Sequence, residues 1–333
     1  MNRSAVLTGR GSLSIRDRTR PVPAPGQVLV RVEAVGICGS DVHYYDHGRI
    51  GPYVVESPVV VGHEAAGTVV EVGPDVDPAR VGDLVALEPG VPDRTCPQCL
   101  AGRYNLCPDV RFFATPPVDG AIAEFVAHDA AFAHTAPAGL DAEQAAMAEP
   151  VSVGVWAARR SGIGPGDRVL VTGAGPIGLF AAQVARAFGA SGVLVTDVSE
   201  FRLGVARDLG FSTVTAGEPL GGEFDVLLEC SGAAPAWAAG VAALAPAARA
   251  VLVGMGADEV ALPVPLVQTR ELTITGIFRY ANTYPTALSL IASGVVDVRT
   301  LITHRFPLSA TEQALTLGRR DPRSLKAVVL PVT

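Results

Sequence analysis

The first half of the chain carries three side chains whose donor atoms suit a divalent metal. Cys38 lies in VGICGSDVHYYDHGRIG, and His63 and Glu64 follow 25 residues later in VGHEAAG. A thiolate, an imidazole and a carboxylate that leave one position open are the ligand types of a catalytic zinc site. Neighbouring residues of a strand point to opposite faces, so His63 and Glu64 can share one ion only at a bend, which Gly62 allows. Glu149, in AMAEPVSVG, is a fourth candidate.

Ser40 and His43 follow Cys38 at short spacing. A hydroxyl beside a metal-bound alcohol, with an imidazole further out, suits a relay that carries a proton to solvent. The sequence predicts that these two residues and Glu149 take part in catalysis, although His43 could equally be a surface residue without a role. The other histidines lack comparable neighbours, so the sequence predicts no catalytic or metal-binding role for them. They are His47, His128, His134 and His304.

A second cluster contains three closely spaced cysteines. Cys96, Cys99 and Cys107 lie in PDRTCPQCLAGRYNLC, and Asp93 stands where a fourth cysteine would complete the spacing. Tetrahedral zinc takes four donors, and a carboxylate is an acceptable one. Five cysteines in total, three of them together, fit metal binding in a reducing compartment better than disulfides. The sequence predicts that Cys230, in LLECSG, is a buried residue at a strand end.

The pattern of predicted secondary structure changes near residue 150. Short β-rich segments separated by Gly and Pro give way, from Arg168 onward, to apolar strands that alternate with helical stretches. That alternation is typical of βαβ units and a parallel sheet. Near the C-terminus, LKAVVLPV indicates a strand that returns to the first domain. The sequence therefore predicts a discontinuous first domain, residues 1–150 and 283–333, with a nucleotide-binding domain, residues 151–282, inserted into it.

Gly173, Gly175 and Gly178 form a G-x-G-x-x-G string between a predicted strand and a predicted helix. In that context the glycines allow a tight turn, close approach of a pyrophosphate and close helix–strand packing. Asp197 ends the next strand, where a carboxylate would bind ribose hydroxyls and repel a 2′-phosphate, so the sequence favours NAD over NADP. Two alternatives remain open: Asp197 could be a helix N-cap, and Arg202 could be a solvated helix residue instead of a neighbour of the ribose.

The amino-acid composition and net charge limit the kinds of partner that this chain can bind. The chain has 333 residues, 49% of them hydrophobic and 18% charged, and a formal net charge of −7. These values indicate a globular protein of two domains and argue against nucleic-acid binding. No apolar run reaches the roughly 18 residues that span a membrane, and the N-terminus lacks an apolar signal core. We expect a cytoplasmic protein with a small-molecule substrate and no nucleic-acid or membrane partner.

Nearly the whole chain resembles the zinc-dependent medium-chain dehydrogenases, and within them the sorbitol (polyol) dehydrogenases. The stretches that carry the resemblance are CGSDVHYYDHGRIG, VGHEAAGTV, GRYNLCPDVRFFATPPVDG, AEPVSVGVWAARR, GAGPIGL and GIFRYANTYP. The segments FFATPP and FRYANT are more specific than the glycine string, because general alcohol dehydrogenases lack them.

The resemblance implies a fold and a set of site residues. The fold is α/β, with a GroES-like β-rich catalytic domain and a doubly wound Rossmann dinucleotide-binding domain. Cys38, His63 and Glu64 would hold the catalytic zinc, with Glu149 bound to it directly or through water. The residues implied in substrate binding are Tyr44, Ile50, Phe113, Thr115, Glu149, Arg279 and Tyr280. Those implied in cofactor binding are Gly173, Gly175, Ile177, Gly178, Asp197, Arg202, Val253, Gly254, Met255, Ile277, Phe278 and Arg279.

Related enzymes bind a second, structural zinc through four cysteines spaced C-x2-C-x2-C-x7-C. Here only the first ligand differs, so the resemblance implies a structural zinc held by Asp93, Cys96, Cys99 and Cys107. The alternative is a metal-free lobe with reduced thiols, as in some animal polyol dehydrogenases. Neither version offers an open coordination position, so this lobe is expected to support structure and not catalysis.

The expected function is the oxidation of a secondary hydroxyl of a sorbitol- or xylitol-like polyol to a ketose, by hydride transfer to NAD in a zinc-dependent enzyme. Sister activities on a cyclitol, idonate, threonine or a polyol phosphate use the same scaffold and remain alternatives. A non-catalytic nucleotide-binding relative is disfavoured, because such relatives lack the metal ligands present here. The resemblance also implies a homo-oligomer, either a dimer or a tetramer.

Overall fold

The computed structural model describes residues 1–256 and 258–332, and the chain divides into two compact units. The first unit comprises Met1–Glu149, Ala287–Ala292 and Val298–Thr333, and the second comprises Pro150–Thr286 and Ser293–Asp297. The second unit is thus inserted into the first. Its bounds include residues 283–286 and 293–297, which the sequence had assigned to the other domain.

The first unit is built around a mixed seven-stranded sheet. Its order is β12-β8-β7-β3-β20-β19, with β11 also paired to β3, and a separate sheet has the order β2-β1-β6. The strands are β1 (Asn2–Gly9), β2 (Ser12–Arg18), β3 (Gln27–Gly36), β4 (Arg49–Ile50), β5 (Tyr53–Val54), β6 (Val59–Val60), β7 (Glu64–Val72), β8 (Leu84–Leu87), β9 (Gly90–Val91), β10 (Arg111–Phe112), β11 (Phe125–Asp129), β12 (Ala133–Thr135), β19 (Ile302–Pro307) and β20 (Lys326–Leu330). The helices are α1 (Gly39–His47), α2 (Pro97–Leu100), α3 (Ala142–Ala146), α10 (Thr311–Leu315) and α11 (Leu317–Arg320).

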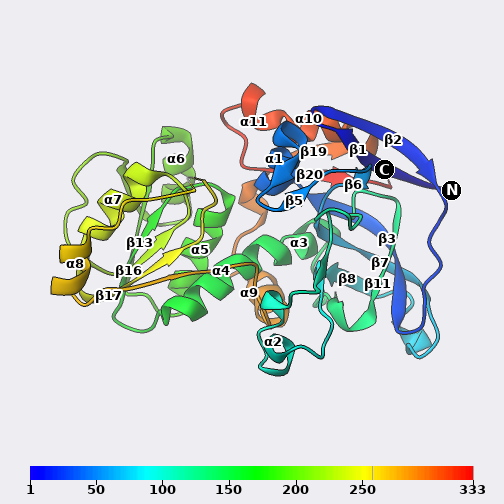
Figure 1. Ribbon diagram of the computed structural model, residues 1–333, viewed down its shortest axis with the longest axis horizontal. Coiled ribbons are helices and arrows are strands. Elements are labelled where there is room, and N and C mark those ends of the chain that lie inside the picture. The colour runs from blue at the N-terminus through cyan, green and yellow to red at the C-terminus, as the bar shows by residue number, and fades with distance from the viewer. Residues whose placement is uncertain (257, 333) are drawn as a thin grey trace. The chain divides into compact units, whose positions relative to one another are not determined.

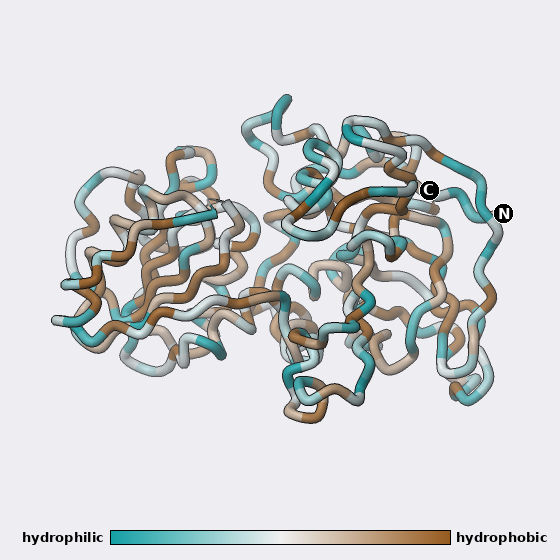
Figure 2. The backbone as a smooth tube through the Cα atoms, in the orientation of Figure 1, coloured by the Kyte–Doolittle hydropathy of each residue, from teal (hydrophilic) through white to brown (hydrophobic). Residues whose placement is uncertain are grey.

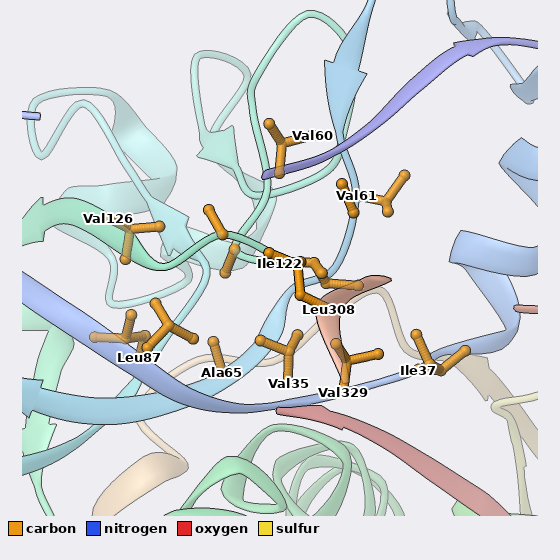
Figure 3. Close-up of a cluster of buried hydrophobic side chains, with 14 of the residues drawn as sticks. Val35, Ile37, Val60, Val61, Ala65, Leu87, Ile122, Val126, Leu308 and Val329 are labelled. Carbon is orange, nitrogen blue, oxygen red and sulfur yellow. The ribbon is translucent and has the colours of Figure 1, made fainter. Parts of the chain in front are cut away.

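Strand β3 lies in the middle of this sheet because it is apolar on both faces. Most of QVLVRVEAVG is buried, as expected for a strand covered from two sides. Figure 3 shows Val35 of β3 in one cluster with Ala65, Leu87 and Val329, which come from β7, β8 and β20. The core of the first unit therefore joins segments from both ends of the chain.

The last strand of the chain lies beside the segment that leads to Cys38. β20 runs antiparallel to β3, with Val328 opposite Gly36. The backbone N–H of Ile37 donates to the Ala327 carbonyl at 2.9 Å. The C-terminal strand is thus placed to contribute side chains to the first metal cluster.

The second unit is a six-stranded parallel sheet of order β15-β14-β13-β16-β17-β18. Counted within the unit, this is strand order 3-2-1-4-5-6, the arrangement of the Rossmann dinucleotide-binding fold, and it confirms the predicted fold class. Figure 2 shows its strands as largely hydrophobic, as expected for a parallel sheet with both faces covered. The strands are β13 (Arg168–Thr172), β14 (Gly192–Asp197), β15 (Ser212–Thr215), β16 (Phe224–Glu229), β17 (Leu244–Leu252) and β18 (Thr273–Gly276).

Helices alternate with these strands along the chain (Figure 1). Those wholly within the second unit are α5 (Pro176–Ala187), α6 (Glu200–Asp208), α7 (Ala234–Ala242) and α8 (Val264–Thr269). Helix α4 (Ala148–Ser161) begins two residues before this unit, and most of α9 (Tyr284–Ala292) belongs to the first unit. Within residues 1–256 and 258–332, no helix combines the length and the apolar character needed to cross a lipid bilayer.

Leu227 of β16 tests the packing of the second unit, because its side chain is fully buried in one cluster with Trp237 and Val241. Leu227→Ala leaves a cavity, and we expect it to lower the free energy of unfolding by about 3 kcal/mol. Both tryptophans, Trp156 and Trp237, belong to this unit, so their fluorescence during urea unfolding reports on it.

Leu262 provides the control, because its side chain is 51% exposed. Leu262→Ala should change the free energy of unfolding by less than about 0.5 kcal/mol. Equal losses in the two variants would contradict the packing described for β16.

Candidate active site

Three candidate metal ligands of the first unit come together in the structure. The Sγ of Cys38, a ring nitrogen of His63 and a carboxylate oxygen of Glu64 lie within 4.8 Å of one another. Gly62 has a φ of +89°, and β7 begins only at Glu64. The bend that the sequence required is therefore present, and it lets two adjacent side chains approach the same point.

Asp41 joins the two segments that carry these ligands, and sequence reasoning missed it. Its Oδ2 accepts from the N–H of Cys38 at 3.0 Å, and its Oδ1 accepts from the N–H of Gly62 at 2.9 Å. Oδ1 also lies 3.7 Å from Nδ1 of His63, where a carboxylate orients a ligating imidazole. Burial opposes the charged ring, yet Asp41 and Cys38 raise the pKa of His63 well above its ordinary value. The available signal was an acidic residue three positions after a helix start.

Lys326 is the second residue that sequence reasoning missed. Its Nζ donates to both carboxylate oxygens of Glu64, at 2.6 and 2.7 Å, and to the Ile37 carbonyl at 3.0 Å. The residue is 3% exposed; burial lowers the pKa of the amine, but Glu64 and other acidic groups raise it above its ordinary value. The sequence held one signal: this is the only lysine in a chain with 25 arginines. A compact ammonium and a planar guanidinium are not interchangeable in a confined position.

Gly36 leaves the space that the Glu64 carboxylate occupies. A β-carbon at Gly36 would lie 2.0 Å from Oε2 of Glu64 and 3.0 Å from the terminal methyl of Met147. Gly36 is also the residue opposite Glu64 in the pairing of β3 with β7. Because Gly36 of β3 has no side chain, the carboxylate of Glu64 on β7 can occupy this space.

The donor set fits zinc. A thiolate, an imidazole and a carboxylate are ligands that zinc accepts, and the three converge on one point in a largely buried place. Glu149, 5% exposed and in the first turn of α4, adds a further negative charge that contributes to the raised pKa of Lys326. The ammonium of Lys326 offsets one of the acidic charges that would face the metal.

Helix α1 carries the residues predicted for proton transfer. It starts directly after Cys38, so Ser40 lies in its first turn, and His43 and Tyr44 lie one turn further along. Residues three and four positions apart share a helix face. Ser40 is half-buried and His43 is exposed, whereas Tyr44 is 6% exposed. The helix therefore leads from the metal cluster to solvent.

The second candidate cluster also assembles in the structure. One ligand atom each from Asp93, Cys96, Cys99 and Cys107 lie within 4.8 Å of one another. Oδ1 of Asp93 accepts from the N–H groups of Cys96 and Thr95, at 3.0 and 2.8 Å, and these bonds lower the pKa of Asp93 to about 2. The carboxylate is thus ionised and aimed at the thiols, as a fourth zinc ligand must be.

A buried carboxylate anchors this lobe to the sheet of the first unit. Glu88 is 2% exposed and accepts from the hydroxyl of Tyr104 at 2.6 Å. Nε2 of His134 lies 2.8 Å from its other carboxylate oxygen, and Nε2 of His128 lies 2.8 Å from its backbone carbonyl. His128 and His134, two of the four histidines that were assigned no chemistry, therefore take part in holding the lobe. Cys230 follows β16, half-buried and outside both clusters.

The glycine string of the second unit makes the turn between β13 and α5. Gly173 has a φ of +92°, and a β-carbon at Gly178 would lie 1.8 Å from the Gly173 carbonyl. Gly175 is the N-cap of α5, and Ile177 lies in the first turn of that helix. These are the backbone conditions under which helix N–H groups face an anionic ligand.

Asp197 is buried beside this turn. Its Oδ2 accepts from the N–H of Ala174 at 2.6 Å, and its Oδ1 accepts from the N–H of Ser199 at 2.8 Å. The N-cap of α6 is Ser199, so the alternative that Asp197 caps the helix is wrong. A guanidinium nitrogen of Arg202 lies 4.0 Å from the place of a β-carbon on Gly175, so this side chain points to the glycine turn.

The remaining cofactor candidates follow strands β17 and β18. The N–H groups of Val253 and Gly254 both donate to the Glu229 carbonyl at 2.8 Å, and Met255 is 70% exposed. The segment Ile277–Arg279 comes directly after β18, with Phe278 49% exposed. The carboxyl ends of parallel strands meet at one edge of the sheet, so these residues share an edge with the glycine turn.

The residues predicted to bind substrate come from both units. In the first unit, Tyr44 lies on α1, Ile50 on β4, and Phe113 and Thr115 follow β10. In the second unit, Arg279 has a φ of +53° and its guanidinium lies 4.7 Å from the ring centroid of Phe278. Tyr280 is 3% exposed, with its ring 5.9 Å from that of Tyr284.

Comparison with known proteins identifies the family. The family model described as alcohol dehydrogenase GroES-like domain matches residues 24–138, and the one described as zinc-binding dehydrogenase matches residues 176–293. Sorbitol dehydrogenase of Bos taurus is 44% identical over 332 residues, which cover 96% of this chain and 93% of the relative. The chain belongs to the zinc-binding dehydrogenases, in their sorbitol dehydrogenase group.

Solved structures of this dehydrogenase family agree with the fold. An Escherichia coli oxidoreductase of unknown specificity superposes with a TM-score of 0.94 at 34% identity, over 99% of both chains. L-Idonate 5-dehydrogenase of Escherichia coli superposes with a TM-score of 0.93 at 29% identity, over 99% of this chain and 98% of that one. The GroES-like and Rossmann architecture is thus that of a zinc-dependent alcohol dehydrogenase.

Replacement of Lys326 tests the buried ion pair. In zinc-free protein, Lys326→Met should lower the free energy of unfolding by about 3–5 kcal/mol, because it leaves the Glu64 carboxylate buried without a counter-charge. In zinc-loaded protein the loss should be smaller, because the bound ion neutralises the same carboxylate. Unfolding by urea, with and without zinc, measures both values. An equal loss with and without zinc would contradict the arrangement.

Replacement of Asp93 tests the second cluster. Metal analysis should find two zinc ions per chain in the unaltered protein and one in Asp93→Ala after dialysis against a mild chelator, because the three thiols then lack a fourth donor. The exposed Asp109 of the same lobe provides the control, since Asp109→Ala should retain both ions. One ion in the unaltered protein would show that the lobe is metal-free.

Proposed function

We propose that this chain is a zinc-dependent, NAD-linked dehydrogenase that oxidises a secondary hydroxyl of a sorbitol- or xylitol-like polyol to a ketose. The observation that carries the proposal is the convergence of Cys38, His63 and Glu64 in a chain that also holds a dinucleotide turn. The 44% identity to sorbitol dehydrogenase supports the class of substrate. Net change at the substrate is the loss of one hydride and one proton.

Cys38, His63 and Glu64 would hold the catalytic zinc, with Glu149 bound to it directly or through water. A bound zinc supplies Lewis acidity, which lowers the pKa of an alcohol at the open position. Asp41 keeps the ring of His63 in its orientation, and Lys326 keeps the carboxylate of Glu64 in place. A bound nicotinamide cofactor would supply the hydride acceptor.

The proton of the substrate hydroxyl leaves along α1. Oγ of Ser40 accepts it while giving its own proton, through an intervening water molecule, to a ring nitrogen of His43, which is exposed and can release it to solvent. This path is supported by the order of the residues on one helix, from the half-buried Ser40 to the exposed His43. Once His43 has released the proton to water, both side chains are back in their starting states.

A polyol is uncharged and rich in hydroxyls, so its contacts should be hydrogen-bonding groups. Tyr44, Glu149, Arg279 and Tyr280 offer such groups, and we assign them to the substrate. The assignment of apolar residues to the walls of the pocket rests on the family resemblance; they are Ile50, Phe113, Phe278 and the methyl side of Thr115. The first unit would then supply the metal and the relay, and the second unit the cofactor site.

NAD is the cofactor that Asp197 favours. The carboxylate of Asp197 sits beside the glycine turn and has lone pairs left for ribose hydroxyls after its two backbone bonds. The residues assigned to the cofactor otherwise follow the carboxyl ends of the strands. They are Gly173, Gly175, Ile177, Gly178, Arg202, Val253, Gly254, Met255, Ile277, Phe278 and Arg279.

A homo-oligomer, dimer or tetramer, is part of the proposal. Strand β18 ends the sheet of the second unit, with β17 as its one neighbour among the described residues. An edge strand of this kind can pair with a second copy of the chain. The exposed side chains of Leu262 and Val264, at 51% and 49%, lie in the segment before it. Five free cysteines are consistent with a reducing cytoplasm, which we propose as the location.

Cys38→Ala tests the function. We expect this variant to lose nearly all NAD reduction with sorbitol or xylitol while it still binds NAD, because only the metal cluster of the first unit is altered. Absorbance of NADH over a panel of sorbitol, xylitol, ribitol, mannitol, inositol, idonate and threonine, with and without a zinc chelator, measures the activity and ranks the substrates.

The matched control is Cys230→Ala, which removes a thiol outside both clusters and should keep most of the activity. Chelator-sensitive turnover of a linear polyol supports the proposal. A signal only with inositol, idonate or threonine would move the enzyme to a sister activity on the same scaffold. Activity retained by Cys38→Ala would refute the zinc mechanism.

A further inference from the structure

His43 and His47 lie next to each other on the exposed side of α1, outside both metal clusters. Their ring centroids are 4.5 Å apart and the rings are inclined by 56°. Both side chains are exposed, and neither ring forms a hydrogen bond or ion pair with the part of the chain that the structure describes. We propose that this pair is an additional binding site for a divalent ion of the zinc class, and that its occupation slows the enzyme.

The geometry of the pair suits chelation. Imidazoles four residues apart stand on one face of a helix, one above the other. Two rings that bind one ion through nitrogens about 2.0–2.1 Å from it have centroids about 4.5 Å apart at a 90° N–metal–N angle and about 5.2 Å apart at the tetrahedral angle. The observed separation of 4.5 Å is within that range without any movement of the helix. Water would complete the coordination.

Helix α1 is held rigidly, so the pair is pre-organised. At its start, Asp41 bonds to the N–H groups of Cys38 and Gly62. At its end, the hydroxyl of Tyr45 donates to Oε1 of Glu312 at 2.6 Å, and α1 packs beside α10, as Figure 1 shows. A ligand site that is already ordered loses less conformational entropy when it binds.

The surroundings favour a cation of intermediate softness. The pair lies at the C-terminal end of the helix, where the helix dipole attracts positive charge. The carboxylate of Asp46 is paired with Arg319, so it does not compete for the rings. Imidazole ligands favour zinc, nickel and copper over magnesium and calcium. The site would therefore respond to transition ions at concentrations above those that fill the two buried clusters.

Inhibition follows from the place of His43, and this part rests on the proposed relay. The ring nitrogen that binds an ion can no longer accept a proton from Ser40. Occupation of the pair would thus interrupt proton release without altering the ligands of the catalytic zinc. Excess zinc would restrain the enzyme through a site separate from the one that it needs for activity.

His47→Gln tests the site, because His47 is not part of the relay. Calorimetric titration of Zn²⁺ into the zinc-loaded enzyme, without NAD or polyol, should find one further ion per chain in the unaltered protein. His47→Gln should weaken this binding at least about tenfold, because the chelating partner is lost. His304→Gln, which removes a half-buried ring paired with Asp321, should leave it unchanged. Mg²⁺ should not bind there.

The same Zn²⁺ additions should inhibit NAD reduction by a polyol, and His47→Gln should resist them by at least about tenfold with unchanged turnover in their absence. No further ion in the unaltered protein, or equal affinity in His47→Gln, would overturn the proposed site. Binding without inhibition would overturn its inhibitory role. Turnover without added metal tests the proposed function separately, so the two failures are distinguishable.

Discussion

The candidate metal site of this dehydrogenase depends on the ion pair between Lys326 and Glu64. Burying two charges is unfavourable unless their geometry is good and their remaining donors are satisfied. Here the ammonium makes three hydrogen bonds, two to Glu64 and one to the Ile37 carbonyl. Because Ile37 precedes Cys38 and Glu64 follows His63, one side chain from the C-terminal strand supports both segments that carry candidate metal ligands. The two ends of the chain must therefore come together before the centre exists.

Buried carboxylates organise backbone turns in both units. Asp41 accepts from the N–H groups of Cys38 and Gly62 and so fixes the two loops that carry the metal ligands. In the second unit, Glu229 accepts from the N–H groups of Ser231 and Gly232 at 2.9 and 3.0 Å. The turn that it holds contacts the glycine string, since a β-carbon on Gly173 would lie 2.9 Å from the Ser231 nitrogen. In each unit a buried carboxylate thus fixes the backbone of a candidate binding site.

The sequence predicted those features that are local. Apolar runs predicted the strands, and the glycine string predicted the turn at Gly173, because both depend on neighbours along the chain. The candidate zinc donors could also be chosen by residue type, since few residues bind zinc, and the structure brings them together. Lys326 and Asp41 were missed for different reasons. Lys326 meets Glu64 from 262 positions away, and no local pattern reports such a contact. Asp41 looked like an ordinary helix-start residue, although it also contacts the second ligand segment.

Because Lys326 is the only lysine, reagents that modify amines have one possible side-chain target in this protein. The only ε-amine of the chain, that of Lys326, is 3% exposed in the folded protein. Acylating reagents, aldehyde cross-linkers and enzymes that attach modifiers to lysine would find no side-chain target on the native surface. The ε-amine would become reactive only when β20 separates from β3, at the moment when the metal site comes apart. The rate at which Lys326 is acylated would therefore report how often strand β20 separates from β3.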